Sequence, residues 1–264
     1  MKLGIATTSF FNRVQTESAF DVLRQLGVDS TEVFLNTFSE YERPFVDALV
    51  PRKGNISVHS VNCLGVQFEP QLFSPSVRAR ADAESIFRKV CYAGFVLGAK
   101  YYTFHGPINL KNRVYKYDYE KLGERMNQLV DIAQSYGINI SYENVHWAYS
   151  SEPDFFKGIL KYCPRLYTTL DIKQAIQADI DPYKFLDAMG NRISTIHLSD
   201  VSRAGDTVLP GQGKFNFEKF FRELEKRNVN THAFIEAYWR DYHDVKELRE
   251  IYDNILDIFE KIKK

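Results

Sequence analysis

Short runs of apolar and β-branched residues recur along the chain, and they alternate with longer stretches in which apolar residues return every three or four positions. Each run is nearly continuous in apolar or β-branched residues, a pattern typical of parallel strands that are buried on both faces. Eight such runs occur, at residues 2–6, 31–35, 56–60, 101–105, 139–143, 166–170, 193–197 and 233–237.

The stretches between the runs predict amphipathic helices. Apolar residues fall on one helical face at 86–97, 122–133 and 248–262. A glycine suited to ending a helix stands before the next run at Gly27, Gly98 and Gly137. Pro153 suits the first turn of a further helix, because its missing N–H has no partner to lose there.

The alternation of strands and helices predicts an α/β fold, a single (β/α)8 TIM barrel that spans residues 1–264 as one domain. Eight repeats in 264 residues give about 33 residues each, close to the size of one barrel unit. A doubly wound open sheet is the alternative, but it carries a glycine-rich turn after its first strand. The segment 4–12, GIATTSFFN, has only Gly4, inside the strand, and this favours the barrel.

Composition places further limits on the function. The 34 lysine and arginine residues equal the 34 aspartate and glutamate residues, and the lack of a basic excess argues against a nucleic-acid partner. The three cysteines share no metal-ligand spacing, so we expect reduced thiols. No apolar run approaches the about 18 residues of a membrane helix, and no signal peptide is recognised. We therefore expect a cytoplasmic protein that does not contact a membrane.

Ionisable side chains stand at the ends of six of the predicted strands. These residues are His59, His105, Glu143, Asp171, His197 and Glu236. In a TIM barrel the C-terminal ends of all strands meet at one rim, where the active site forms. Carboxylates that converge there repel one another and lose hydration, so a positive charge among them is expected.

Four of these side chains form the predicted metal-ligand set: Glu143, Asp171, His197 and Glu236. Three carboxylates and one imidazole suit one divalent metal ion, which can be Mn²⁺, Mg²⁺, Co²⁺ or Zn²⁺. Such a set leaves coordination positions open for the oxygens of a substrate.

These residues resemble the sugar isomerase/epimerase family of xylose isomerase-like barrels. The similarity covers nearly the whole chain, and it rests on Glu143-Asn144, LDIKQA with Asp171, HLSD with His197, GQG, and FIEA with Glu236. The resemblance implies one metal ion on these four ligands, with the two glutamates also acting as acid and base. It further implies that Arg203, six residues after His197, contacts the substrate, and it leaves a homo-oligomer open.

One position departs from the family pattern. Where relatives often carry a histidine three residues after the strand-six aspartate, this chain has Gln174. A glutamine hydrogen-bonds a hydroxyl group, but it takes up no proton near neutral pH. We therefore expect Gln174 to bind the substrate and not to serve as a base.

The first hypothesis is a metal-dependent isomerase or epimerase of a sugar or sugar-like hydroxycarbonyl compound. Glu143 and Glu236 would move a proton beside the carbonyl group through a metal-stabilised enediolate. The predicted substrate-binding residues are His59, His105, Arg203, Trp147 and Gln174. For Trp147, an apolar wall for the sugar and ordinary burial in a loop stay equally open.

Other activities remain as alternatives. An endonuclease IV-type, zinc-dependent abasic-site DNA endonuclease would need three zinc ions and extra ligands. The chain has Gln174 in place of a histidine, and 211–217, GQGKFNF, lacks the expected Asp-x-His. A dehydratase of the same family would use related enolate chemistry. A barrel that binds a sugar without turnover is a third alternative, against which the complete ligand set argues.

The segment after the seventh strand holds two further features. Asp200 either orients His197 or a loop group, or it caps a turn. Gly211-Gln212-Gly213 lacks the signature of a phosphate-binding loop. We interpret it as a turn before a helix that begins near Asn216; the alternative is a movable cover over the barrel mouth.

Overall fold

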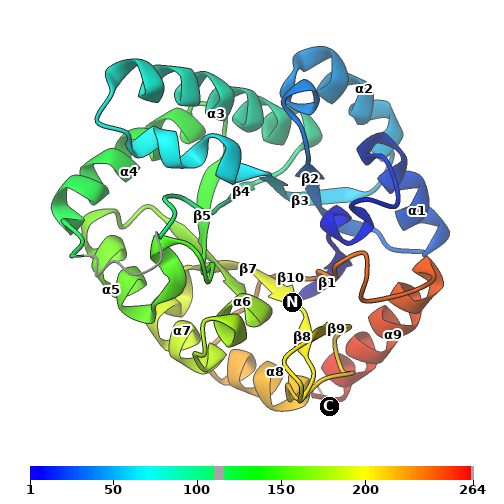
Figure 1. Ribbon diagram of the computed structural model, residues 1–264. Coiled ribbons are helices and arrows are strands. Elements are labelled where there is room, and N and C mark those ends of the chain that lie inside the picture. The colour runs from blue at the N-terminus through cyan, green and yellow to red at the C-terminus, as the bar shows by residue number, and fades with distance from the viewer. Residues whose placement is uncertain (110–115, 263–264) are drawn as a thin grey trace.

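The structure is a computed structural model, and it describes residues 1–109 and 116–262. Eight strands surround a central axis, and helices form a ring outside them (Figure 1). All eight predicted strands are confirmed. They are β1 (Lys2–Ile5), β2 (Ser30–Leu35), β3 (Ser57–Cys63), β4 (Tyr101–Phe104), β5 (Asn139–Glu143), β6 (Tyr167–Asp171), β7 (Ile193–Leu198) and β10 (His232–Ile235).

The strands pair in parallel in the order β1-β10-β7-β6-β5-β4-β3-β2, which confirms the (β/α)8 barrel. Side-chain hydrogen bonds connect β2, the last strand of this order, to β1, the first, and to the residues directly after β1. The Thr31 hydroxyl on β2 donates to the Ile5 carbonyl on β1 at 2.7 Å, and the Thr7 hydroxyl accepts from the backbone N–H of Phe34 at 2.7 Å. A Cβ atom at Gly4 would lie 2.2 Å from the Ser30 carbonyl oxygen, so this close approach requires a glycine.

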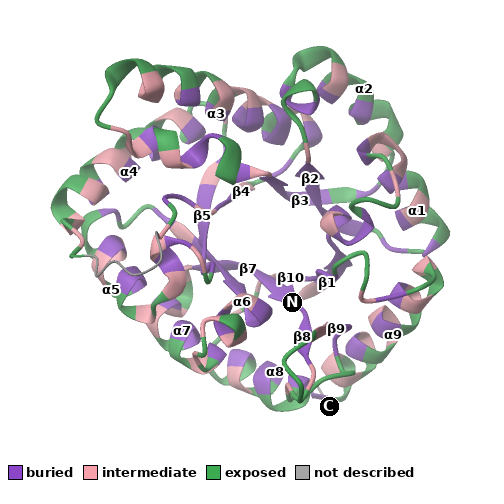
Figure 2. Ribbon diagram, in the orientation of Figure 1, coloured by how far each residue is buried: buried purple, intermediate pink, exposed green. Residues whose placement is uncertain are grey.

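The helices pack their apolar faces against the strands (Figure 2). They are α1 (Ala19–Gln25), α2 (Arg43–Lys53), α3 (Val77–Leu97), α4 (Tyr119–Gln134), α5 (Pro153–Tyr162), α6 (Ile172–Gln177), α7 (Pro182–Met189), α8 (Phe217–Lys226) and α9 (Val245–Ile262). Their ends follow the predicted signals. Pro153 lies in the first turn of α5, and Gly98 ends α3 in the left-handed conformation at φ +78°.

The interior of the barrel is polar, whereas the layer between strands and helices is apolar. Inside, the Ser141 hydroxyl lies 2.6 Å from that of Thr169 and 2.7 Å from that of Ser194, on three successive strands. Outside, the Phe87 ring of α3 packs on Tyr102 and Phe104 of β4. Because side chains alternate along a strand, short hydroxylated residues fill the barrel and leave its rim to the larger ionisable groups.

A short antiparallel hairpin, β8 (Asp200–Val201) and β9 (Thr207–Val208), follows β7 and was not predicted. The buried Asp200 carboxylate accepts from the backbone N–H groups of Gly211, Gly213 and Phe215 at 3.0–3.1 Å. Asp200 therefore holds the loop, one of the roles that the sequence left open. The loop leads into α8, whose first turn Asn216 caps, as the turn interpretation expected.

Two further observations concern the cysteines and the helices within residues 1–109 and 116–262. Cys63, Cys91 and Cys163 are buried, and none forms a disulfide. Among these residues, no helix combines the length and apolar character that crossing a bilayer requires.

Candidate metal centre

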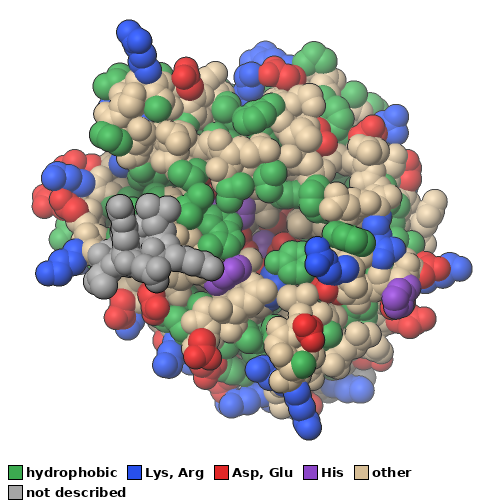
Figure 3. Space-filling model, in the orientation of Figure 1, with side chains coloured by type: hydrophobic (Ala, Val, Ile, Leu, Met, Phe, Trp, Pro, Cys, Tyr) green, Lys and Arg blue, Asp and Glu red, His purple; other side chains and the backbone are tan. Residues whose placement is uncertain are grey.

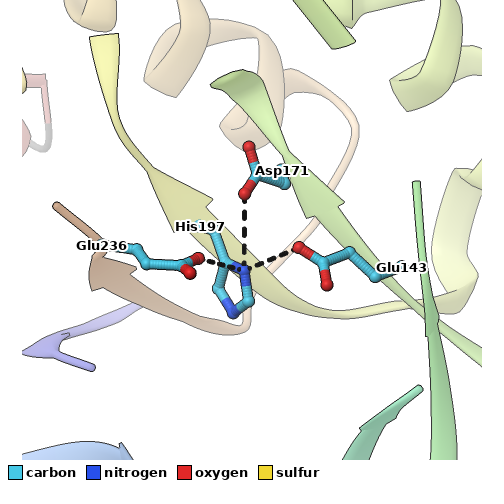
Figure 4. Close-up of side chains that lie close together, drawn as sticks. All are labelled: Glu143, Asp171, His197 and Glu236. Atoms are coloured by element: carbon cyan, nitrogen blue, oxygen red, sulfur yellow. Dashed lines mark hydrogen bonds and ion pairs between the residues drawn. The ribbon is translucent and has the colours of Figure 1, made fainter. Parts of the chain in front are cut away.

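Four strands bring the predicted ligand set together at one rim of the barrel (Figure 4). Glu143 and Asp171 end β5 and β6, His197 is the residue before the end of β7, and Glu236 directly follows β10. The Nδ1 atom of His197 lies 2.7 Å from Glu236 Oε2, 3.0 Å from Glu143 Oε1 and 3.7 Å from Asp171 Oδ2. All four side chains are buried.

The geometry of these atoms fits a divalent ion. The four ligand atoms lie within 4.8 Å of one another. An ion with bonds of about 2.1 Å holds neighbouring ligand atoms about 3.0 Å apart and opposite ones about 4.2 Å apart. Asp171 Oδ2 is buried without a hydrogen-bond partner among the described residues, and Glu236 Oε2 has no hydrogen bond beyond its contact with His197 Nδ1. Such oxygens are costly unless a cation compensates them, so the residues present fit the predicted metal ion.

The other ring nitrogen of His197, Nε2, faces a carboxylate that the sequence analysis did not identify. Glu32 Oε1 lies 3.1 Å from His197 Nε2, inside the barrel. The other Glu32 oxygen accepts hydrogen bonds of 2.6 Å from the hydroxyls of Ser60 and Thr103. Glu32 therefore favours a proton on Nε2 and leaves Nδ1 facing the three carboxylates. A glutamate within the apolar run 31–35 was the available signal.

His105 lies at the rim as predicted, beside Glu143. Its Nε2 atom is 3.1 Å from Glu143 Oε2, the oxygen that faces away from His197. The fully buried Glu69 accepts from the backbone N–H groups of His105 and Gly106 at 2.8 and 2.7 Å, and so fixes this turn. Burial alone would lower the pKa of His105, but Glu69 and Glu143 raise it to about 10.

A second residue that the sequence analysis missed is Lys173. It follows Asp171 by two residues and is 2% exposed, although a lysine is rarely buried without an anionic partner. Its ammonium nitrogen lies 3.8 Å from Asp171 Oδ2 and 4.3 Å from the centre of the Tyr238 ring. The motif LDIKQA contains this lysine, but the motif alone does not indicate which way the side chain points.

The charges in the cluster shift each other's pKa. Burial raises the pKa of Glu143, but His197 and His105 outweigh it and hold this pKa below its ordinary value. Burial is likewise outweighed at Glu236, where Lys173 and His197 lower the pKa. Glu143 and Glu236 therefore stay ionised, as metal ligands must, whereas burial raises the pKa of Asp171 against the opposing effect of Lys173.

His59 does not belong to this rim, and the expectation that it ends its strand there is wrong. Strand β3 continues past His59 to Cys63, so the histidine lies near the opposite end of the barrel. Its Nε2 atom is 3.0 Å from the Ser194 carbonyl oxygen, and its ring stacks on His232, the first residue of β10, at 3.9 Å. The strand continues past the run 56–60 through Val61, Asn62 and Cys63, so the end of the run is not the end of the strand.

The remaining predicted substrate-binding residues are distributed unequally. Gln174 lies beside the cluster and accepts hydrogen bonds from the backbone N–H and ring Nδ1 of His146 at 3.1 and 2.5 Å. The half-buried Trp147 packs near His105, with ring centres 6.0 Å apart. Arg203, by contrast, is exposed in the turn between β8 and β9. Within the described ranges it is not among the residues that line the cavity at the cluster.

A cavity of about 150 Å³ opens above the cluster. Glu143, Glu236 and Lys173 line one side of it, and Phe34 and Trp147 contribute apolar surface. Figure 3 shows the corresponding hollow in the centre of this face, with hydrophobic side chains around it and histidine and acidic side chains at its base. The arrangement suits a small polar molecule with an apolar face.

Comparison with known families identifies the barrel. Residues 20–261 match the model of the family described as xylose isomerase-like TIM barrel. The chain belongs to this family. A comparison with curated protein sequences gives no significant match.

Solved structures share the whole barrel at low sequence identity. D-psicose 3-epimerase from Clostridium cellulolyticum H10, solved with D-tagatose, is 15% identical with a TM-score of 0.78, and the match covers 99% of both chains. The IOLI protein with a bound zinc atom is 16% identical with a TM-score of 0.81, again over 99% of both chains. The probable 3-DHS dehydratase AsbF from Bacillus anthracis is 12% identical with a TM-score of 0.74, over 97% of this chain and 99% of that one. These similarities show the shared fold.

Proposed function

We propose that this xylose isomerase-like barrel is a divalent-metal-dependent isomerase or epimerase of a small hydroxycarbonyl compound such as a sugar. The observation that carries the proposal is the buried cluster of Glu143, Asp171, His197 and Glu236 at the base of a cavity. Among structures with the same fold are a sugar epimerase and a protein that holds zinc. The proposed activity combines the metal binding and sugar epimerisation of these two proteins with the four clustered side chains of this chain.

The four clustered side chains would hold one ion, and their donor set of three carboxylates and one imidazole suits Mn²⁺, Mg²⁺, Co²⁺ or Zn²⁺. When bound, such an ion supplies a Lewis acid that polarises the substrate carbonyl and stabilises the charge of an enediolate. Glu32 would hold His197 with Nδ1 toward the ion, because it lies 3.1 Å from the opposite ring nitrogen.

The proton transfers fall to the two glutamates. Glu143 and Glu236 approach His197 from opposite sides (Figure 4), so they would flank a substrate above the cluster. One carboxylate would take the proton from the carbon next to the carbonyl, and the electrons of that C–H bond would form the enediolate. The other glutamate would take the proton of the hydroxyl group on that carbon and deliver it to the opposite face, which would invert the carbon, and the first glutamate would return its proton to the hydroxyl oxygen. His105 would hold the second oxygen of Glu143, which lies 3.1 Å from its Nε2.

A dehydratase is the second candidate, and the barrel of the probable 3-DHS dehydratase AsbF supports it. It would share the first proton removal, after which a hydroxyl group would leave as water. A three-zinc endonuclease has less support. Within the described residues, one group of potential metal ligands is found, and His59 lies near the other end of the barrel.

Deuterium exchange tests the proposal. The Mn²⁺-loaded protein is incubated in D₂O with a panel of ketoses and hydroxyketones, and NMR follows the hydrogen on the carbon next to the carbonyl. We expect exchange at that carbon by the wild type and a loss of at least about 100-fold in Glu143→Gln, from removal of the general base. The exposed Glu225→Gln variant is the matched control. Bound Mn²⁺ with neither exchange nor elimination of water across the panel would contradict the proposal.

A further inference from the structure

The proposed proton transfer does not use Lys173, although this side chain lines the cavity next to the metal-ligand cluster. Its ammonium group is 2% exposed and lies 3.8 Å from Asp171 Oδ2, on the side where the Tyr238 ring lies 4.3 Å away. A buried ammonium group is expensive unless an anion compensates it. The anion that compensates Lys173 when a metal ion is bound therefore indicates which substrates the site accepts.

A bound ion would change the surroundings of Lys173. Its ammonium group lies among the carboxylates of the cluster, and Asp171 Oδ2 is 3.8 Å away. A divalent ion would bring two positive charges to the same carboxylates, so they would depend less on Lys173 for compensation. Lys173 would then be available to an anionic oxygen in the cavity that it lines, beside the Tyr238 ring.

We propose that Lys173 binds an anionic oxygen of the substrate, and that the substrate is a small hydroxycarbonyl compound bearing a carboxylate. This inference rests on the proposed function, which it narrows. Among the described residues that line the cavity, Lys173 is the one lysine, and none is an arginine. Arg203 lies exposed in the β8–β9 turn. A carboxylate is the smallest anionic group that such a compound carries, and the test below compares it with inorganic phosphate.

Direct binding tests the proposal without turnover. Isothermal titration at saturating Mn²⁺ compares glycolate with glycolamide, which has the same number of non-hydrogen atoms but a neutral amide in place of the carboxylate. Two uncharged variants, Lys173→Gln and Lys173→Met, are used so that one remains if the other does not fold. Lys173→Arg keeps the charge, and Lys184→Gln changes an exposed lysine of α7 as the matched control.

Loss of one charge-assisted hydrogen bond is expected to weaken glycolate binding about 10–100-fold in the uncharged variants, whereas glycolamide binding stays within about twofold. Lys173→Arg should retain much of the preference for glycolate, and Lys184→Gln should retain all of it. This pattern would also exclude general damage to the cavity, since the neutral ligand reports on the same surface.

Three results would count against the inference. An unchanged glycolate-to-glycolamide ratio in both uncharged variants, with Mn²⁺ still bound, would reduce Lys173 to a counter-ion of the carboxylates and leave the proposed function standing. Tighter Lys173-dependent binding of inorganic phosphate than of glycolate would overturn the assignment of a carboxylate. Failure of the wild type to bind Mn²⁺ would remove the proposed function, and this inference with it.

Discussion

Glu32 is a charged residue inside a largely apolar strand, and its contacts explain why it is buried there. It is fully buried, and its carboxylate is held on one side by Ser60 and Thr103 and faces His197 on the other. Strands β2 and β7 are not adjacent in the sheet, so this contact crosses the barrel interior. A metal-bound imidazole gains basicity and a fixed orientation from a carboxylate at its other nitrogen.

We expect Glu32→Gln to weaken Mn²⁺ binding about 10–100-fold, because a neutral amide polarises the imidazole less than a carboxylate does. Isothermal titration with Mn²⁺ measures the change, and circular dichroism confirms the fold. Glu40→Gln is the matched control, since Glu40 is also buried but hydrogen-bonds Thr16 and the backbone N–H of Asn36 away from the cluster. Equal Mn²⁺ affinity in wild type and Glu32→Gln would show that Glu32 does not support the ligand.

At the scale of elements, the hairpin β8–β9 and the loop after it depend on one carboxylate. Asp200 accepts from the backbone N–H groups of Gly211, Gly213 and Phe215, which lie 11 to 15 residues further along the chain. A Cβ atom at Gly213 would come within 2.3 Å of Asp200 Oδ1, so the loop approaches this side chain as closely as a glycine allows.

Asp200→Asn should therefore lower the free energy of unfolding by about 1–3 kcal/mol, because the amide offers one acceptor oxygen and leaves at least one of the three N–H groups without its partner. Hydrogen exchange should accelerate at 211–215 and stay unchanged in the strands of the barrel. Urea unfolding and exchange mass spectrometry give the two measurements. The exposed Asp206→Asn serves as control. Wild-type exchange at 211–215 in Asp200→Asn would refute the proposed restraint.

The end of the barrel opposite the metal centre holds a histidine pair. Burial, and then the neighbouring His232, lower the pKa of His59 to about 3, and burial lowers that of His232 to about 4. Both pKa values lie below that of a histidine in the unfolded chain, about 6.5. At pH values between the folded and the unfolded pKa, the unfolded chain therefore binds more protons than the folded chain does. The stability that this pair contributes is thus present above pH 6.5 and is lost as the pH falls from 6.5 toward 3.

From pH 7 to pH 5, each such histidine should cost about 2 kcal/mol of the free energy of unfolding. In His59→Gln this loss should be smaller than in the wild type by about that amount, because the glutamine does not titrate. Urea unfolding at both pH values checks the prediction, and the exposed Gln25→Asn, which changes no titratable group, is the comparison expected to keep the full pH dependence. Parallel pH profiles of wild type and His59→Gln would contradict it.

At the scale of the whole molecule, the candidate metal centre joins four strands that are far apart in the sequence. An ion bound there stabilises the folded state and has no preformed site in the unfolded chain. At an ion concentration of about 100 times Kd, the gain is about 2.7 kcal/mol. The melting temperature of the whole barrel should therefore depend on the metal.

Chelation with EDTA should lower the melting temperature by about 5–10 °C relative to the Mn²⁺-loaded protein, as follows from this gain for a chain of such a size. Differential scanning calorimetry measures the shift. Asp171→Asn should show little or none of it, whereas Glu225→Gln should show it in full. A melting temperature that is identical with Mn²⁺ and with EDTA would argue against a metal centre.

Local patterns were sufficient for the elements and for the four clustered side chains. All eight strands form where apolar runs predicted them, because a strand buried on both faces needs such a run. Glu143, Asp171 and Glu236 stand at strand ends, and a barrel brings these ends to one rim whatever the loops do. The prediction that His59 ends its strand at the rim was wrong, because apolar residues do not mark the end of a strand whose inward-facing positions are polar.

What the sequence by itself determined is the order of strands and helices and the identity of the four clustered side chains, since both depend on local periodicity and on the barrel topology. Only the tertiary structure decided that Glu32 faces His197, that Lys173 turns into the cavity, and that Arg203 stays outside it. The physical reason is that contacts across the barrel depend on the side-chain direction and register of strands far apart in the chain, which no short segment encodes.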